Sequence, residues 1–196
     1  MPHYFTNDEV KSNEKIINIK IKDENLKFIV DNGVFSKKGL DFGTRSLLES
    51  IDTNKIKGDI LDFGCGYGPI GIYISKKTNL KVDMVDINER ALNLSKKNAK
   101  LNNVEVNVYQ SDIFSNIVNS YDYIITNPPI RVGKKILYEI LFQSLAHLKE
   151  NGKLFLVINK NQGAKTLLKD LNEKYLANVI NKNKGFYIIE AQNRWQ

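Results

Sequence analysis

Residues 60–71 read Ile-Leu-Asp-Phe-Gly-Cys-Gly-Tyr-Gly-Pro-Ile-Gly, and this stretch decides the fold. Three apolar residues and Asp62 form the end of a buried strand, after which three glycines at alternate positions turn the backbone where a side chain would not fit. Such a turn lets backbone amides approach a ligand closely. Pro69 suits the first turn of a following helix, because its missing N–H is not needed there. Strand, glycine turn and helix together predict a site for a nucleotide-type cofactor.

The glycine pattern fits two different cofactors. Gly66-x-Gly68-x-x-Gly71 matches the fingerprint of dinucleotide-binding proteins, whereas the run from Asp62 through alternate glycines matches the loop of methyltransferases that use S-adenosylmethionine. A glycine turn that only packs strand on helix is a third interpretation. Asp86 indicates a ligand with a ribose, because it ends a second apolar strand at a spacing where a carboxylate can accept hydrogen bonds from both ribose hydroxyls.

Length and composition suit one sizeable α/β domain. The chain has 196 residues, of which 42% are hydrophobic, and such a chain buries a core without disulfides or structural metals. We therefore expect a single domain over residues 1–196, with a hairpin, a lid and a helix in residues 1–57 and the cofactor-binding and catalytic core in residues 58–196. No metal site is predicted.

The cysteine count and the hydropathy pattern bear on the compartment. Cys65 is the only cysteine, so no internal disulfide can form, and we interpret it as a small residue chosen for space in the glycine turn rather than as a reactive thiol. The first residues lack the apolar run of a signal peptide, and no segment approaches the roughly 18 apolar residues of a membrane span. The sequence therefore predicts a cytoplasmic protein without a membrane partner.

The positive charge is concentrated in the last third of the chain. The net charge is +7, and residues 131–196 hold 12 Lys and Arg against 5 Asp and Glu, whereas the preceding residues are nearly balanced. A solvated, lysine-rich surface is one interpretation. The other is a basic rim that faces a nucleic-acid substrate.

The part of the chain before the glycine turn contains a hairpin and a long connection. Apolar and polar residues alternate over 17–21 and again over 26–30, which predicts a β-hairpin with one apolar face that packs on the main sheet or its helices. Residues 31–44 hold too many turn formers for a regular element and form either a connection or a lid. Thr44 is predicted to cap a helix that runs from Arg45 to about Asp52.

Strands and helices alternate after the glycine turn. Alternation predicts parallel pairing with right-handed crossovers and helices on both faces of the sheet. Only a few residues join the last two strands, so these two must be antiparallel. The predicted strands are Lys81–Asp86, Val104–Tyr109, Tyr121–Thr126, Lys153–Ile158, Leu176–Asn181 and Phe186–Ala191, and the predicted helices are Glu89–Leu101, capped by Asn88, Lys134–Lys149 and Ala164–Glu173.

The motif Asn127-Pro128-Pro129-Ile130 follows a strand and indicates the chemistry. An exocyclic amine on a base is a poor nucleophile, because its lone pair is delocalised into the ring. Two acceptors bonded to its hydrogens would aim that lone pair at a methyl donor. The side-chain oxygen of Asn127 and the carbonyl of Pro128 can supply them, and the two prolines make the turn rigid and free of backbone donors.

The chain at this point resembles the class I S-adenosylmethionine-dependent methyltransferases that act on amino or amide nitrogens. The lid stretch over residues 33–44 is further similar to the catalytic half of the RsmC group, which methylates the exocyclic amine of guanine in small-subunit ribosomal RNA. The likeness covers nearly the whole chain, in a single-domain form. The residues that carry it are Asp62-x-Gly64-x-Gly66, Asp86, Asp112 and Asn127-Pro128-Pro129.

The resemblance implies a Rossmann-like fold with a seven-stranded, mostly parallel sheet whose last strand is antiparallel, and it implies S-adenosylmethionine as cofactor. Phe35 and Thr44 would close over the cofactor, Ile87 would pack on its adenine, and Asp112 would bond the adenine amine. The catalytic residues would be Asn127, Pro128 and Pro129. The implied cofactor-binding residues are Phe35, Thr44, Asp62, Gly64, Cys65, Gly66, Asp86, Ile87, Asp112, Ile113 and Asn127.

RNA is the predicted partner, and one residue departs from the family pattern. Members of the family commonly have, at the position of Ile130, an aromatic residue whose ring stacks on a flipped base. The predicted substrate-binding residues are Ile130, Arg131, Lys134, Lys135, Lys182 and Lys184.

Three alternative functions stay open. The protein could methylate a release-factor glutamine, act as a dinucleotide-dependent oxidoreductase, or bind RNA or assist assembly without catalysis.

Overall fold

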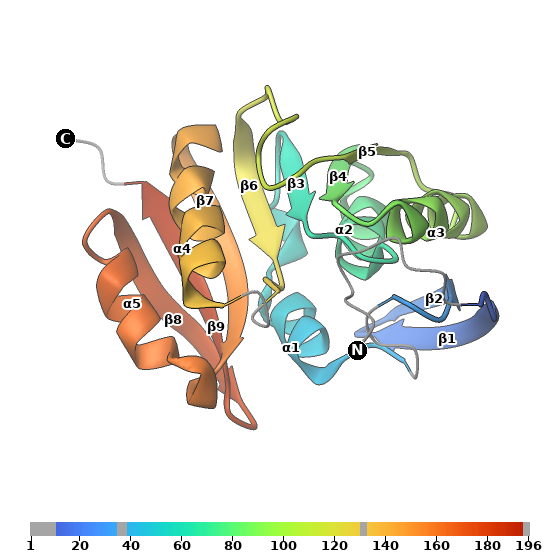
Figure 1. The fold of residues 1–196 in the computed structure, drawn as a ribbon, viewed down its shortest axis with the longest axis horizontal. Coiled ribbons are helices and arrows are strands. Elements are labelled where there is room, and N and C mark those ends of the chain that lie inside the picture. The colour runs from blue at the N-terminus through green and yellow to red at the C-terminus, as the bar shows by residue number, and fades with distance from the viewer. Residues whose placement is uncertain (1–10, 35–38, 130–132, 194–196) are drawn as a thin grey trace.

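The computed structural model describes residues 11–34, 39–129 and 133–193. Its centre is a seven-stranded sheet with the spatial order β5-β4-β3-β6-β7-β9-β8 (Figure 1). Every strand predicted after the glycine turn is present. The strands of this sheet are β3 (Ile60–Phe63), β4 (Val82–Asp86), β5 (Val106–Gln110), β6 (Tyr121–Thr126), β7 (Leu148–Asn159), β8 (Tyr175–Asn183) and β9 (Phe186–Asn193).

The strand directions confirm the predicted topology. Strands β5, β4, β3, β6 and β7 run parallel, and β9 pairs antiparallel with both β7 and β8. The reversed strand therefore lies inside the sheet, and β8 runs parallel to β6. The carboxyl ends of β3, β4, β6 and β8 consequently share one edge, where ligands gather in open α/β sheets.

Helices cover both faces of the sheet, because each helix buries one apolar face on it. Helices α1, α2 and α3 share a core with one face of the sheet and with the hairpin, and α4 and α5 pack on the other face. The hairpin is the two-stranded sheet β1-β2. The elements are β1 (Lys15–Ile21), β2 (Glu24–Val30), α1 (Phe42–Ser50), α2 (Pro69–Thr78), α3 (Glu89–Leu101), α4 (Lys134–Gln143) and α5 (Ala164–Leu171).

Two asparagines of α3 and the turn after it hold the hairpin against the core. The Asn98 side chain accepts from the backbone N–H of Ile29 at 2.6 Å and donates to its carbonyl at 2.9 Å, and Asn102 makes the same pair of bonds to Lys27. These amides take the place of a neighbouring strand. The expectation that the hairpin packs on the covering helices is therefore confirmed.

The predicted boundaries around α1, α4 and β7 were wrong in part. Thr44 does not cap α1, since Asp41 is the N-cap and its side chain accepts from the Thr44 N–H at 3.0 Å. The predicted helix to Lys149 ends at Gln143 and continues as one short 3-10 turn, and β7 begins at Leu148. Pairing of Leu148 with β6 draws this segment into the sheet, which outweighs the apolar periodicity that predicted a longer helix.

Candidate functional site

The glycines of the turn between β3 and α2 have two different structural roles. Gly64 and Gly66 have φ of +70° and +56°, and a Cβ at either position would meet nothing within 4 Å. A Cβ at Gly68 or Gly71 would come within 3.0 Å of the Met84 side chain. The open side of the loop therefore lies at Gly64 and Gly66, whereas Gly68 and Gly71 are required for packing. This division favours the S-adenosylmethionine-type pattern over the dinucleotide fingerprint, which places its ligand approach at the later glycines.

Asp62 lies beneath this loop at the start of α2. It is fully buried, and its Oδ2 accepts from the Gly71 N–H at 2.8 Å, while its Oδ1 has no hydrogen-bond partner among the described residues. Burial raises the pKa of Asp62 to about 8, against the lowering effect of the bond from Gly71. A carboxyl group thus occupies the helix N-terminus that would receive a pyrophosphate in a dinucleotide site. Direct contact between Asp62 and a cofactor stays a prediction.

The raised pKa of Asp62 predicts an unusual pH dependence of stability. The pKa of Asp62 is about 8 in the folded protein, against about 4 for an aspartate in an unfolded chain. Between these pH values the folded state keeps the proton and the unfolded state has lost it, so the free energy of unfolding falls as the pH rises. The free energy of unfolding should drop across this window by at most about 5 kcal/mol. Urea denaturation at pH 5–9 measures it, and Asp62→Asn should remove this component. Parallel curves for wild type and variant would contradict the shift.

Asp86 joins the glycine loop to the end of β4. Its Oδ2 accepts from the Gly66 N–H and its Oδ1 from the Asn88 N–H, each at 2.9 Å. Burial raises the pKa of Asp86, and these backbone bonds oppose the rise. Each carboxylate oxygen retains capacity for one further bond, as two ribose hydroxyls would require. Ile87 follows at the same edge and is half-buried.

Helix α3 supports the loop from behind through residues that the sequence reasoning missed. The Ser95 hydroxyl donates to the Gly66 carbonyl at 2.8 Å, and the Asn98 amide donates to the Tyr67 carbonyl at 2.8 Å. The thiol of Cys65 is buried near Ser95, and burial raises its pKa. A reactive thiol is therefore disfavoured. The backbone of Cys65 is also used within the protein, since its N–H donates to the Val85 carbonyl at 2.8 Å and its carbonyl accepts from the Gly68 N–H at 2.9 Å. Contact between Cys65 and a cofactor stays a prediction. Both Ser95 and Asn98 are polar and lie at inward-facing positions of α3, and this pattern in the sequence could have identified them.

Asp112 and Ile113 lie just beyond β5. The Ser111 N–H donates to the Asp86 carbonyl at 3.2 Å, which brings this segment beside Asp86. The Asp112 side chain is exposed, and Ile113 has a left-handed φ of 48°, held by the Ser111 hydroxyl on its carbonyl at 2.9 Å. A β-branched residue rarely adopts this conformation, so the turn is fixed by its surroundings rather than by local preference.

Asn127 follows β6 directly beside the glycine loop. Thr126 pairs with Phe63, so Asn127 and Gly64 are the next residues on two adjacent parallel strands. The Asn127 Nδ2 donates to the Thr44 hydroxyl at 2.9 Å and to Asp41 Oδ1 at 3.2 Å. Both partners belong to the start of α1, which lies beside the end of β6 in Figure 1. The amide nitrogen is thus used within the protein, whereas Oδ1 accepts no hydrogen bond from the residues that the structure describes.

The structure brings several predicted residues together and leaves others untested. Thr44 contacts Asn127, and Asp86 contacts Gly66. Pro128 is buried and Pro129 is half-buried, as a rigid turn requires. Asp41 was missed as a partner of Asn127, although an aspartate three residues before an amide donor is a common N-cap pattern. The predicted residues Phe35, Ile130 and Arg131 lie outside the described residues.

The four predicted lysines that the structure describes are exposed and lie at this edge of the sheet. Lys134 and Lys135 begin α4, directly after the segment that follows Asn127. Lys182 lies over the Tyr187 ring and Lys184 over the Phe42 ring, with 4.8 and 5.1 Å from each Nζ to the ring centroid. Lys184 therefore reaches the first residue of α1, next to Asp41. Lysines interleaved with aromatic rings are typical of surfaces that contact nucleic acid.

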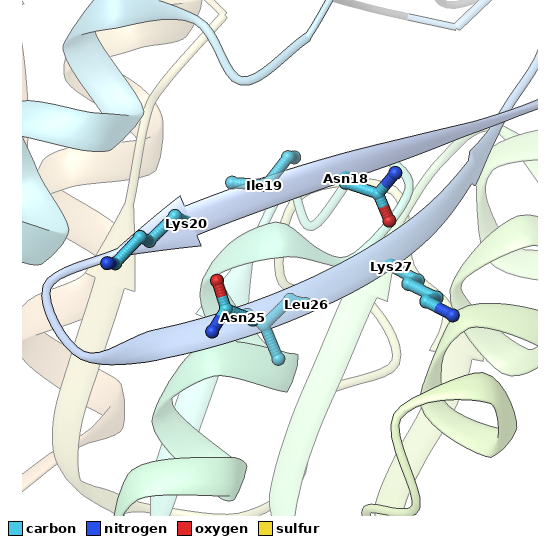
Figure 2. A pocket seen from close by; sticks show the side chains of 6 residues that line it. All are labelled: Asn18, Ile19, Lys20, Asn25, Leu26 and Lys27. Carbon is cyan, nitrogen blue, oxygen red and sulfur yellow. The ribbon is translucent and has the colours of Figure 1, made fainter.

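A separate hollow lies on the hairpin and is distinct from this edge. None of the residues that line it is among the predicted site residues, so it contributes nothing to the site. They are Asn18, Ile19, Lys20, Asn25, Leu26 and Lys27 (Figure 2). Within the described ranges, no group of three or more His, Cys, Asp or Glu side chains is arranged to hold a metal ion. In the same part of the chain no helix is both long and apolar enough to cross a membrane.

Comparison with known proteins gives three findings. The family described as methyltransferase small domain matches residues 25–190. The uncharacterized protein YbxB of Bacillus subtilis is 43% identical over 97% of this chain and 98% of its own length. Ribosomal RNA small subunit methyltransferase C of Haemophilus influenzae is 44% identical over 87% of this chain, but the match covers only 52% of that protein. The chain thus corresponds to about half of the named methyltransferase.

A solved structure resembles the fold described above. It is a T. thermophilus 16S rRNA N2 methyltransferase, RsmC, in complex with AdoMet and guanosine. The two structures superpose with a TM-score of 0.84 over 95% of this chain and 52% of that one, at 23% sequence identity. At this identity the likeness establishes the fold.

Proposed function

This chain belongs to the methyltransferase small domain family of S-adenosylmethionine-dependent enzymes, and from that premise we propose that it methylates the exocyclic amine of a guanine in small-subunit ribosomal RNA. The proposal includes a cytoplasmic location, where such RNA is found, and a single domain over residues 1–196. The observation that carries it is the orientation of the Asn127 amide, which directs both nitrogen hydrogens into the protein and leaves Oδ1 as an acceptor. The similarity of this chain to a ribosomal RNA methyltransferase supports ribosomal RNA as the substrate.

The residues present fit the cofactor. Gly64 and Gly66 leave open space beside the loop, and Asp86, which binds the Gly66 N–H, offers two carboxylate oxygens next to it. Asp112 is exposed at the end of the next strand, where it can accept from an adenine amine. We therefore assign the glycine loop to the methionine part, Asp86 to the ribose, and Ile87, Asp112 and Ile113 to the adenine.

The protein's part in the reaction is to orient the amine. When bound, S-adenosylmethionine supplies a methyl group on a sulfonium sulfur: the amine nitrogen gains the N–C bond, the C–S bond breaks with its electrons on sulfur, and the amine then loses one proton to solvent. Asn127 Oδ1 and the Pro128 carbonyl accept from the two amine hydrogens and aim the lone pair. The same acceptors stabilise the positive charge that develops on the nitrogen.

The experiment that tests this proposal compares substrates. Purified protein is incubated with labelled S-adenosylmethionine and with ribosomal RNA, isolated small subunits or release factors, and the products are digested and analysed. Label on the exocyclic nitrogen of guanine is the expected result. Label on a glutamine amide would replace the RNA proposal by the release-factor alternative, and cofactor binding without turnover on any substrate would favour a non-catalytic role.

The basic edge of the sheet supplies a prediction about RNA binding. Replacing Lys135, Lys182 and Lys184 by Gln should weaken RNA binding and lower the salt dependence by about one unit of slope for each phosphate that the variant no longer neutralises. Affinity for S-adenosylmethionine should not change. Filter binding at several salt concentrations measures both the affinity and the slope.

A matched triple variant controls for net charge. Lys57, Lys81 and Lys100 are exposed and lie near the opposite edge, at or near the amino ends of β3, β4 and β5. Their replacement by Gln changes the net charge equally but should leave RNA affinity nearly intact. If the two triple variants bind RNA equally well, the basic edge is a general solvated surface rather than a substrate rim.

A further inference from the structure

The two contacts of the Asn127 amide are not equivalent. A threonine hydroxyl can donate or accept, so Thr44 can bind either the nitrogen or the oxygen of a neighbouring amide. A carboxylate only accepts, so the Asp41 carboxylate binds the amide nitrogen alone. Asp41 is therefore the group that determines which way the Asn127 amide faces, at an Oδ1–Nδ2 distance of 3.2 Å.

The Asp41 carboxylate is itself held in place by the first turn of α1. Its Oδ1 also accepts from the Thr44 N–H at 3.0 Å. A Cβ at Gly43 would lie 3.1 Å both from this oxygen and from the Phe186 ring, so the absence of a side chain at Gly43 permits the arrangement. Phe186 packs in turn on Phe42, with ring centroids 5.8 Å apart. The start of α1, the beginning of β9 and the Asp41 carboxylate thus pack against one another.

We propose that Asp41 is a positioning residue for methyl transfer that acts through Asn127. This inference rests on the proposed function. Asp41 keeps Asn127 Oδ1 turned toward the substrate amine, and its negative charge polarises the amide so that Oδ1 becomes a stronger acceptor. That polarisation matters most when the amine nitrogen gains positive charge in the transition state. In this scheme Asp41 touches neither the substrate nor the cofactor.

Two substitutions separate positioning from helix capping. Asp41→Ser retains a good N-cap for α1 but is one bond shorter and withdraws the acceptor from Asn127. Asp41→Asn retains both the cap and an acceptor oxygen, but it loses the charge and the restriction to accepting. Single-turnover methylation should slow about 10- to 100-fold in Asp41→Ser and less in Asp41→Asn. The affinity for S-adenosylmethionine and the melting temperature should stay close to those of wild type.

A double-mutant cycle identifies the route by which Asp41 acts. If Asp41 acts through Asn127, the change Asp41→Ser should cost almost nothing in a chain that already carries Asn127→Ala. Equal losses in the two backgrounds, or an unchanged rate in Asp41→Ser alone, would overturn the proposal. A loss of rate matched by an equal loss of cofactor affinity would likewise assign Asp41 to the fold or to cofactor binding.

A spectroscopic measurement keeps the test independent of the substrate. The side-chain NH₂ signals of Asn127 in a ¹⁵N spectrum are those that disappear in Asn127→Ala. In wild type these protons should be protected from exchange with water, and in Asp41→Ser the protection should fall. If no RNA is methylated but the protection behaves as expected, the proposed function fails while the orientation of Asn127 by Asp41 stands. Unprotected protons in wild type would overturn the orientation itself.

Discussion

Asn127→Ala should lower the rate of methyl transfer by about 100-fold or more while leaving the affinity for S-adenosylmethionine nearly unchanged. The substitution removes the acceptor Oδ1, whose bond to the amine strengthens as the nitrogen becomes positive, and losing one such oriented partner typically costs this much. The retained partners Asp41 and Thr44 keep α1 in place, because the helix cap does not depend on Asn127. Single-turnover kinetics and calorimetry measure the rate and the affinity separately.

A matched control for this substitution lies at the end of the next strand. Asn161 is exposed just after β7, so Asn161→Ala removes a side-chain amide of the same kind and leaves the contacts of Asn127 unchanged. Its rate should equal that of wild type. A parallel loss of rate and cofactor affinity in Asn127→Ala would show that Asn127 serves the cofactor or the fold instead of the substrate amine.

The second large effect is expected at Asp86. Asp86→Ala should weaken S-adenosylmethionine binding about 30- to 150-fold, because two charge-assisted bonds to the ribose hydroxyls are removed, worth roughly 2–3 kcal/mol in total. Isothermal titration calorimetry measures the change. Circular dichroism shows whether the variant has folded, since Asp86 also accepts from the Gly66 and Asn88 backbone.

Ser95→Ala separates removal of the ribose contact from loosening of the loop. Ser95 donates to the carbonyl of Gly66, the same residue whose N–H binds Asp86, but it lies behind the loop on α3. Affinity in Ser95→Ala should fall only a few-fold, as for one neutral hydrogen bond. If the two variants lose affinity equally, Asp86 supports the loop and does not hold the ribose.

The sequence alone determined the features that depend on local patterns. Apolar alternation defined the hairpin, and the short turn before Phe186 required a reversed strand, because a few residues cannot cross over to a parallel neighbour. The stretch over residues 60–71 predicted a strand, a turn and a helix that begins near Pro69, and β3 and α2 lie there. These predictions succeed because periodicity, turn geometry and strand connection are set by residues close together in the chain.

Only the tertiary structure decided how distant segments meet. The sequence assigned the cap of α1 to Thr44, whereas the structure gives it to Asp41, whose carboxylate also binds Asn127 from 86 positions away. Likewise, the pattern of glycines could not show that Gly64 and Gly66 face open space while Gly68 meets Met84. Side-chain contacts of this kind depend on the three-dimensional packing of whole elements, which no local spacing encodes.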